Sequence, residues 1–165
     1  MCIRDRFYDK LPKAIDTGLG KQAVQVIAFF AYNCKACEKH EDELQSWLNK
    51  NDKDISFIRV PSTLVRNGNE LARLHYTAQE LSSVSDLRKG LYDKVINRQI
   101  ALDRRDLLAE YLGSRTGKNS FSVEMSMESM SINSAVMFAE ELSTCLLYTS
   151  PSPRDATLSR MPSSA

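Results

Sequence analysis

The feature that most constrains the fold is a pair of cysteines, Cys34 and Cys37, placed where an apolar run gives way to a charged, helical pattern. The run from Val24 to Ala31 is nearly all apolar, as in a strand covered on both faces within a parallel or mixed sheet. After Cys37, Leu44 and Leu48 recur at helical spacing. The sequence therefore predicts that Cys34 lies at or near a helix N-terminus and that Cys37 lies one turn deeper.

Both ends of the chain match translated sequencing adapter rather than protein. Residues 1–6 (MCIRDR) and about 145–165, which begin CLLYTSPSPRD, correspond to the in-frame products of library adapters. We expect the protein proper to be a fragment spanning residues 7–144, with Cys2 and Cys145 outside it. The two remaining cysteines are too few for a disulfide framework or a four-cysteine zinc site within the fragment.

Charge and length narrow the classes of function. The whole chain has a formal net charge of +1, and the charges also nearly balance when both ends are set aside. Domains that bind nucleic acid or anionic membranes concentrate positive charge, so neither partner is indicated. No stretch approaches the roughly 20 apolar residues of a membrane span. The length suits one domain with its own core.

A second apolar run follows the cysteine helix and predicts a second strand. It comes after the polar break NKNDKD and ends at Pro61. Its apolar members are Ile55, Phe57, Ile58 and Val60. A strand, a helix and a strand within so short a segment predict a right-handed unit with two parallel strands.

The rest of the fragment, residues 62–144, has helical periodicity almost throughout. Four amphipathic helices are predicted from apolar residues that share a face. Those residues are Leu71, Leu74, Ala78 and Leu81, then Val84, Leu87, Leu91 and Val95, then Leu107, Leu108, Tyr111 and Leu112, and last Phe121, Met125, Ile132, Val136 and Ala139. We therefore divide the fragment into residues 7–61 and a helical region at 62–144.

This order of elements resembles the DsbA family of thiol:disulfide oxidoreductases, which insert a helical domain into a thioredoxin fold. The similarity lies in the segments QVIAFFAYNCKAC, ISFIRVPSTLV, ELARLHYTAQEL and SDLRKGLYDKVI. It implies an α/β fold, specifically an incomplete thioredoxin-like fold with a DsbA-type helical insertion and without the C-terminal strands.

The chain departs from the family pattern in three places. Lys35 and Ala36 separate the cysteines, where the best-known members have Pro-His, so oxidising strength cannot be carried over. Ala28 stands where the family often has a buried acidic residue. The family also has a cis-proline loop and further strands after the helices, and residue 145 is reached before any such segment. Pro61 does not replace that loop, because it ends the second strand.

The resemblance and the helix N-terminus together assign roles to the cysteine pair. Cys34 is expected to be the nucleophile and Cys37 the resolving thiol. Lys35 and the positive end of the helix are expected to stabilise the Cys34 thiolate. The alternatives are two ordinary buried thiols and a solvated lysine. No cofactor is expected beyond the redox-active disulfide itself.

Four further residues have weaker assignments. His40 is an auxiliary candidate for moving protons, although a packed or solvated histidine is the simpler interpretation. Tyr32 and Asn33 are expected to line the approach of a substrate peptide, unless Asn33 only caps the helix. His75 is expected at the surface or between helices.

The resulting hypothesis is a periplasmic or otherwise extracytoplasmic enzyme, with a signal peptide absent from the fragment. Its partners would be protein substrates with thiols or disulfides and a redox partner protein. One alternative is a zinc- or copper-binding module in which Cys34 and Cys37 supply half of the site, completed by His40 or a second chain. Another is a thioredoxin-like interaction domain with a vestigial site.

Overall fold

The structure is a computed structural model that describes residues 24–51, 55–81, 84–102 and 104–147. Its elements, in chain order, are β1 (Gln25–Phe30), α1 (Lys35–Asn51), β2 (Ser56–Pro61), α2 (Gly68–Leu81), α3 (Val84–Ile96), α4 (Arg105–Thr116), α5 (Ser120–Met127), α6 (Met130–Leu142) and the π-helical turn η1 (Ser143–Leu147). The proposed adapter segment 1–6 and residues 148–165 lie outside the described residues. Residues 145–147 belong to η1, and Leu146 packs against the core. The division into segments stays a prediction.

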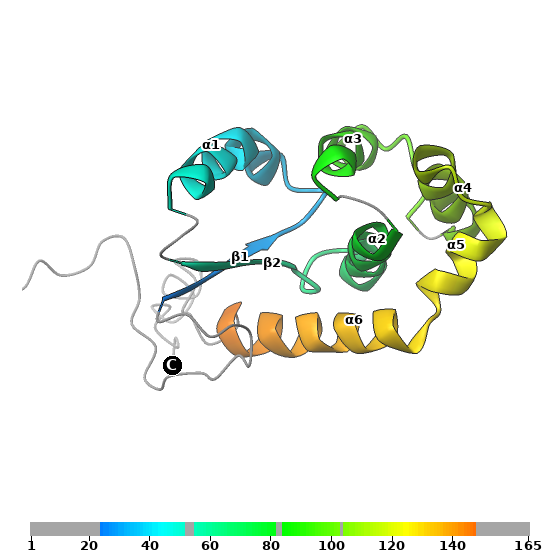
Figure 1. The fold of residues 1–165 in the computed structure, drawn as a ribbon. Coiled ribbons are helices and arrows are strands. Elements are labelled where there is room, and N and C mark those ends of the chain that lie inside the picture. Colours follow the sequence, from blue (N-terminus) through cyan, green and yellow to red (C-terminus); the bar gives the residue numbers. More distant parts are fainter. Residues whose placement is uncertain (1–23, 52–54, 82–83, 103, 148–165) are drawn as a thin grey trace, which may run out of the picture.

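The two strands form a parallel pair, as predicted, with Gln25 opposite Ser56 and Phe30 opposite Pro61. Both strands lie within one residue of the predicted positions, and α1 connects them. In Figure 1, α1 lies on one side of the sheet and α6 crosses beneath the other. Within the described part of the chain, β1 pairs with β2 alone. Consequently β1 is less covered than predicted, and only its last residue, Phe30, is buried.

The main core joins the end of β1 to the helices that follow β2. The helix α2 is central to it and contributes Leu71, Leu74 and Ala78, all fully buried or nearly so. Phe30 and Tyr32 pack into the same core from the sheet side. A separate cluster on the other side of the sheet joins β2 to α6. The segment that carries the cysteines is thus attached to the helical region by continuous apolar packing.

The predicted fourth helix is two helices. Ser129 interrupts it, because the Ser129 hydroxyl accepts a hydrogen bond from the Ile132 N–H and caps a new helix, α6. The interruption changes which residues face the core. Phe121 and Met125, predicted on the buried face, are 69% and 59% exposed, whereas Val123 and Met127 are buried.

Candidate functional site

Cys34 caps the N-terminus of α1, as the sequence predicts. Its backbone N–H donates to the Ala31 carbonyl (3.0 Å), and its carbonyl accepts the first helical hydrogen bond, from the Glu38 N–H (3.2 Å). Cys37 lies one turn into the helix and forms a disulfide with Cys34, with 5.3 Å between the two Cα atoms. A two-residue spacing at a helix start brings the two sulfurs together in this way.

The two cysteines have different surroundings. The backbone N–H of Cys37 donates a hydrogen bond to the Cys34 Sγ, with 3.1 Å between nitrogen and sulfur. The Cys37 side chain packs against the main core. Helix N-terminal N–H groups that lack a backbone partner stabilise negative charge, so this arrangement favours a thiolate at Cys34 once the disulfide is reduced.

Tyr32 does not line the approach of a substrate, so that part of the prediction is wrong. Its side chain is completely buried and packs edge-on against the rings of Phe30 and Tyr92. Its hydroxyl lies 2.9 Å from the His75 Nδ1. Burial raises the pKa of Tyr32, and the nearby Tyr92 raises it further. The apolar core under the cysteine turn accounts for this placement, since the ring fills space between β1 and the helices.

His75 lies inside the protein, on α2, and is only 3% exposed. The interhelical position that the sequence allowed is therefore correct, and the surface position is wrong. Burial lowers the pKa of His75 to about 3, and Arg88 and Arg59 lower it as well. The imidazole is neutral at physiological pH and pairs with the Tyr32 hydroxyl.

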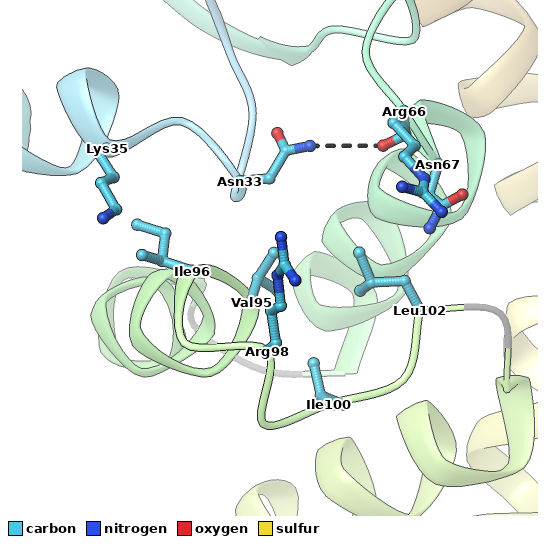
Figure 2. A pocket seen from close by; sticks show the side chains of 9 residues that line it. All are labelled: Asn33, Lys35, Arg66, Asn67, Val95, Ile96, Arg98, Ile100 and Leu102. Atoms are coloured by element: carbon cyan, nitrogen blue, oxygen red, sulfur yellow. Dashed lines mark hydrogen bonds between the residues drawn. The ribbon is translucent and has the colours of Figure 1, made fainter.

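The remaining predicted residues lie on the outer surface. Asn33 is exposed and donates from Nδ2 to the Arg66 carbonyl at 3.4 Å. Lys35 is exposed and, with Asn33, lines a pocket on the side of α2 and α3 (Figure 2). His40 is also exposed, and its Nδ1 lies 3.1 Å from the Glu43 carboxylate. This contact with solvent and with Glu43 fits the simpler interpretation of a solvated histidine.

The structure also reveals a charged cluster that sequence reasoning missed. The Glu41 carboxylate on α1 bonds to the Arg59 guanidinium on β2 at 2.8 Å and to the Arg88 guanidinium on α3. All three side chains are less than 20% exposed. Burial lowers the pKa of Arg59, Arg88 lowers it further, and Glu41 opposes both effects. Glu41 follows Cys37 by four residues and so shares its helix face. A carboxylate thus lies on the inner face of the cysteine helix, although Ala28 stands where the resembled family often has a buried acidic residue.

Neither a metal-binding cluster nor a membrane helix occurs in the described ranges. No group of three or more histidine, cysteine, aspartate and glutamate side chains there could hold a metal ion. None of the helices described is both long enough and apolar enough to cross a bilayer.

Sequence comparison relates the chain to curated thiol:disulfide interchange proteins. No family model matches it. It is 25% identical over 123 residues to the thiol:disulfide interchange protein DsbA of Burkholderia cepacia, in an alignment that covers 70% of this chain and 57% of that protein. The corresponding protein of Bordetella pertussis is 24% identical over 119 residues, covering 72% and 56%. The chain spans little more than half the length of these relatives.

Structural comparison gives the fold. A crystal structure of a Pseudomonas aeruginosa DsbA variant matches with a TM-score of 0.67 and 18% identity over 82% of this chain and 76% of that one. The oxidoreductase NmDsbA1 from N. meningitidis matches with a TM-score of 0.67 and 23% identity over 84% and 72%. The expected architecture, a partial thioredoxin-like fold with a helical insertion, is confirmed.

Proposed function

We propose that this chain, which is DsbA-like in sequence and fold, exchanges disulfides with protein substrates through the motif Cys34-Lys35-Ala36-Cys37. The observation that carries the proposal is the disulfide at the start of α1, with the Cys37 N–H donating to the Cys34 sulfur. A helix N-terminus that stabilises one thiolate of a Cys-X-X-Cys pair is the physical basis of reactive disulfides. The similarity to curated thiol:disulfide interchange proteins supports the same chemistry.

In the forward direction, a substrate thiolate attacks the Cys34 sulfur. A new substrate–Cys34 bond forms, the Cys34–Cys37 bond breaks, and Cys37 leaves as a thiolate that takes up a proton. A second substrate thiolate then attacks the substrate sulfur of the mixed disulfide and releases Cys34 as a thiolate. The substrate dithiol has lost two electrons and two protons. The protein has gained both electrons and, at Cys37, one proton; the other proton goes to the solvent and Cys34 stays a thiolate. The reverse sequence reduces a substrate disulfide.

Lys35 is proposed to stabilise the Cys34 thiolate through its charge, in addition to the contribution of the helix N-terminus. A unit charge about 6 Å away contributes roughly 0.7 to 3 kcal/mol, and exposure favours the low end. We also propose an extracytoplasmic location, the periplasm in a bacterium, because disulfides persist where thiols are not kept reduced. A redox partner protein would restore the starting state.

The proposal is tested by exchange with a synthetic peptide that carries two cysteines. The unmodified chain, with its disulfide formed, should oxidise the reduced peptide, and Cys34→Ser should abolish this exchange. In Cys37→Ser, the free Cys34 thiolate should instead attack the disulfide of the oxidised peptide, release one peptide thiolate and leave a mixed disulfide at Cys34, identified by mass spectrometry. Absence of exchange by the unmodified chain, or a mixed disulfide that forms only at Cys37, would overturn the assignment. A zinc titration of the reduced chain checks the metal-binding alternative independently.

A further inference from the structure

A pocket of about 440 Å³ lies next to the cysteine turn. The residues on either side of Cys34, Asn33 and Lys35, both line it. The other walls come from the turn before α2, from the last turn of α3 and from the segment that follows it (Figure 2). A peptide held at Cys34 could therefore extend directly into this pocket.

Three cationic side chains line the pocket. Lys35, Arg66 and Arg98 line it, and no acidic side chain is among its described lining residues. None of these three cations forms an ion pair with a described residue, whereas Arg59, Arg88 and Arg105 all do. Their charge is thus not neutralised within the described structure and is available to a ligand.

The rest of the lining is largely apolar, from residues Val95, Ile96, Ile100 and Leu102. In Figure 2, the Arg98 side chain extends between Val95 and Asn33, toward the centre of the pocket. The pocket therefore offers both apolar surface for aliphatic groups and positive charge for carboxylates. A peptide segment that carries both acidic and apolar residues fits this combination.

The backbone holds Arg98 in this position. Arg98, the second residue after α3, has φ +54°, a left-handed conformation that is usually adopted by glycine or asparagine. The Gln99 N–H bonds to the Lys94 carbonyl at 2.8 Å and closes the turn. Asn67, which has φ +57°, lines the same pocket. These are the two non-glycine residues with positive φ in the described ranges. A positive φ costs energy at a non-glycine residue, so it persists only where the surrounding structure holds it. Such positions are frequent at ligand sites.

From these observations we infer that the pocket binds the segment of a protein substrate that flanks its reacting cysteine, and that it selects segments with acidic side chains. The inference rests on the proposed function and specifies its substrate class. Arg66 and Arg98 act as specificity residues that contact substrate carboxylates, while the exchange itself occurs at Cys34. Exposed ion pairs are weak individually, so the selectivity should be modest and sensitive to salt.

The test uses three peptides with the same two-cysteine core, flanked by glutamate, glutamine or lysine residues. The second-order rate of their oxidation is measured with the unmodified 165-residue chain and with Arg98→Asn, Arg66→Gln and Arg98→Lys. Asparagine tolerates the left-handed conformation at residue 98, so that variant should fold. Each variant is compared with the unmodified chain on the same peptide, which cancels the intrinsic reactivity of the peptide thiols.

We expect Arg98→Asn and Arg66→Gln each to lower the rate with the glutamate peptide by about two- to fivefold and to leave the glutamine peptide within about twofold. Arg98→Lys should retain most of the rate, and about 0.5 M salt should remove the preference. Lys118→Glu is the matched control, since Lys118 is exposed and does not line the pocket. It should leave the ratio of glutamate to glutamine rates unchanged.

Two outcomes would overturn the inference. One is an equal effect of the arginine variants on all three peptides, and the other is a loss of preference as large in Lys118→Glu as in Arg98→Asn. Either would leave the exchange chemistry intact. Failure of the unmodified chain to oxidise any of the peptides would instead contradict the proposed function, so the two failures are distinguishable.

Discussion

The backbone N–H of Cys37 donates to the Sγ of Cys34, so the first turn of α1 places a hydrogen-bond donor on the outer of the two sulfurs. The inner sulfur belongs to a side chain that packs against the core. This asymmetry supports the different roles proposed for the two cysteines. Reduction should leave negative charge on Cys34 rather than on Cys37.

Lys35→Glu should make the disulfide less oxidising. The reversed charge beside Cys34 raises the free energy of the thiolate and thus destabilises the reduced form. A change of about 1 kcal/mol corresponds to roughly 20 mV in a two-electron couple. Equilibration with glutathione measures the potential, and Lys39→Glu, an exposed position farther along α1, is the control. A potential that is unchanged in Lys35→Glu, or shifted the other way, would show that the lysine charge does not act on the sulfur.

Glu41→Gln should destabilise the fold by about 3 kcal/mol. The substitution leaves Arg59 and Arg88 largely buried and facing each other without a counter-ion, and loss of one partner from a buried ion pair is costly. Urea unfolding monitored by circular dichroism gives the free energy. Glu43→Gln, on the same helix, removes only an exposed contact with His40 and should change little. Equal stabilities of the two variants would mean that the charged cluster contributes nothing to the fold.

The stability of the chain should fall as the pH drops below about 6.5, in part because of His75. Its pKa is about 3 when folded and about 6.5 when unfolded, so in this interval only the unfolded state binds the proton. Each pH unit then removes about 1.4 kcal/mol of stability. Urea unfolding at pH 7, 6 and 5 should show a shallower slope for His75→Gln than for the unmodified chain. Identical slopes would contradict a buried, neutral His75.

Gly68→Ala should destabilise the turn that leads into α2. A Cβ atom at Gly68 would lie 2.3 Å from the Thr63 carbonyl oxygen, and backbone cannot move aside as a flexible side chain can. Overpacking of this kind costs roughly 1 to 3 kcal/mol. Gly117→Asn is the control, because Gly117 has open space around it and asparagine tolerates its φ of +68°. Thermal unfolding should separate the two, and a neutral Gly68→Ala would show that the turn relaxes.

Local patterns were sufficient to predict the elements that hold the cysteines. The apolar run, the change to helical spacing and the second apolar run ending at Pro61 depend on neighbouring residues alone, and the structure confirms all three. The helix N-terminal position of Cys34 follows from the same short-range pattern. The break at Ser129 is also a local signal, because serine is a favoured N-cap. It was obscured by apolar residues that continue at nearly helical spacing on both sides.

Long-range contacts were not predictable in the same way. Glu41 lies in a run of charged residues that resembles a solvated helix face, and nothing near it in the sequence indicates Arg59 and Arg88, which come from two other elements. Tyr32 lies two residues before Cys34, which suggested a role at the surface, but the packing of the helices decides where its ring lies. The pocket lined by Arg66 and Arg98 likewise depends on how two turns meet.

The most direct test of the central claim is the pH dependence of alkylation of the reduced chain. Mass spectrometry of the resulting peptides separates Cys34 and Cys37 from Cys2 and Cys145, and Cys34→Ser and Cys37→Ser confirm each assignment. The account predicts that Cys34 reacts much faster than Cys37 at neutral pH, with a midpoint clearly below the value of about 8.5 for an ordinary thiol. Equal rates for the two cysteines, with midpoints at or above about 8.5, would contradict it.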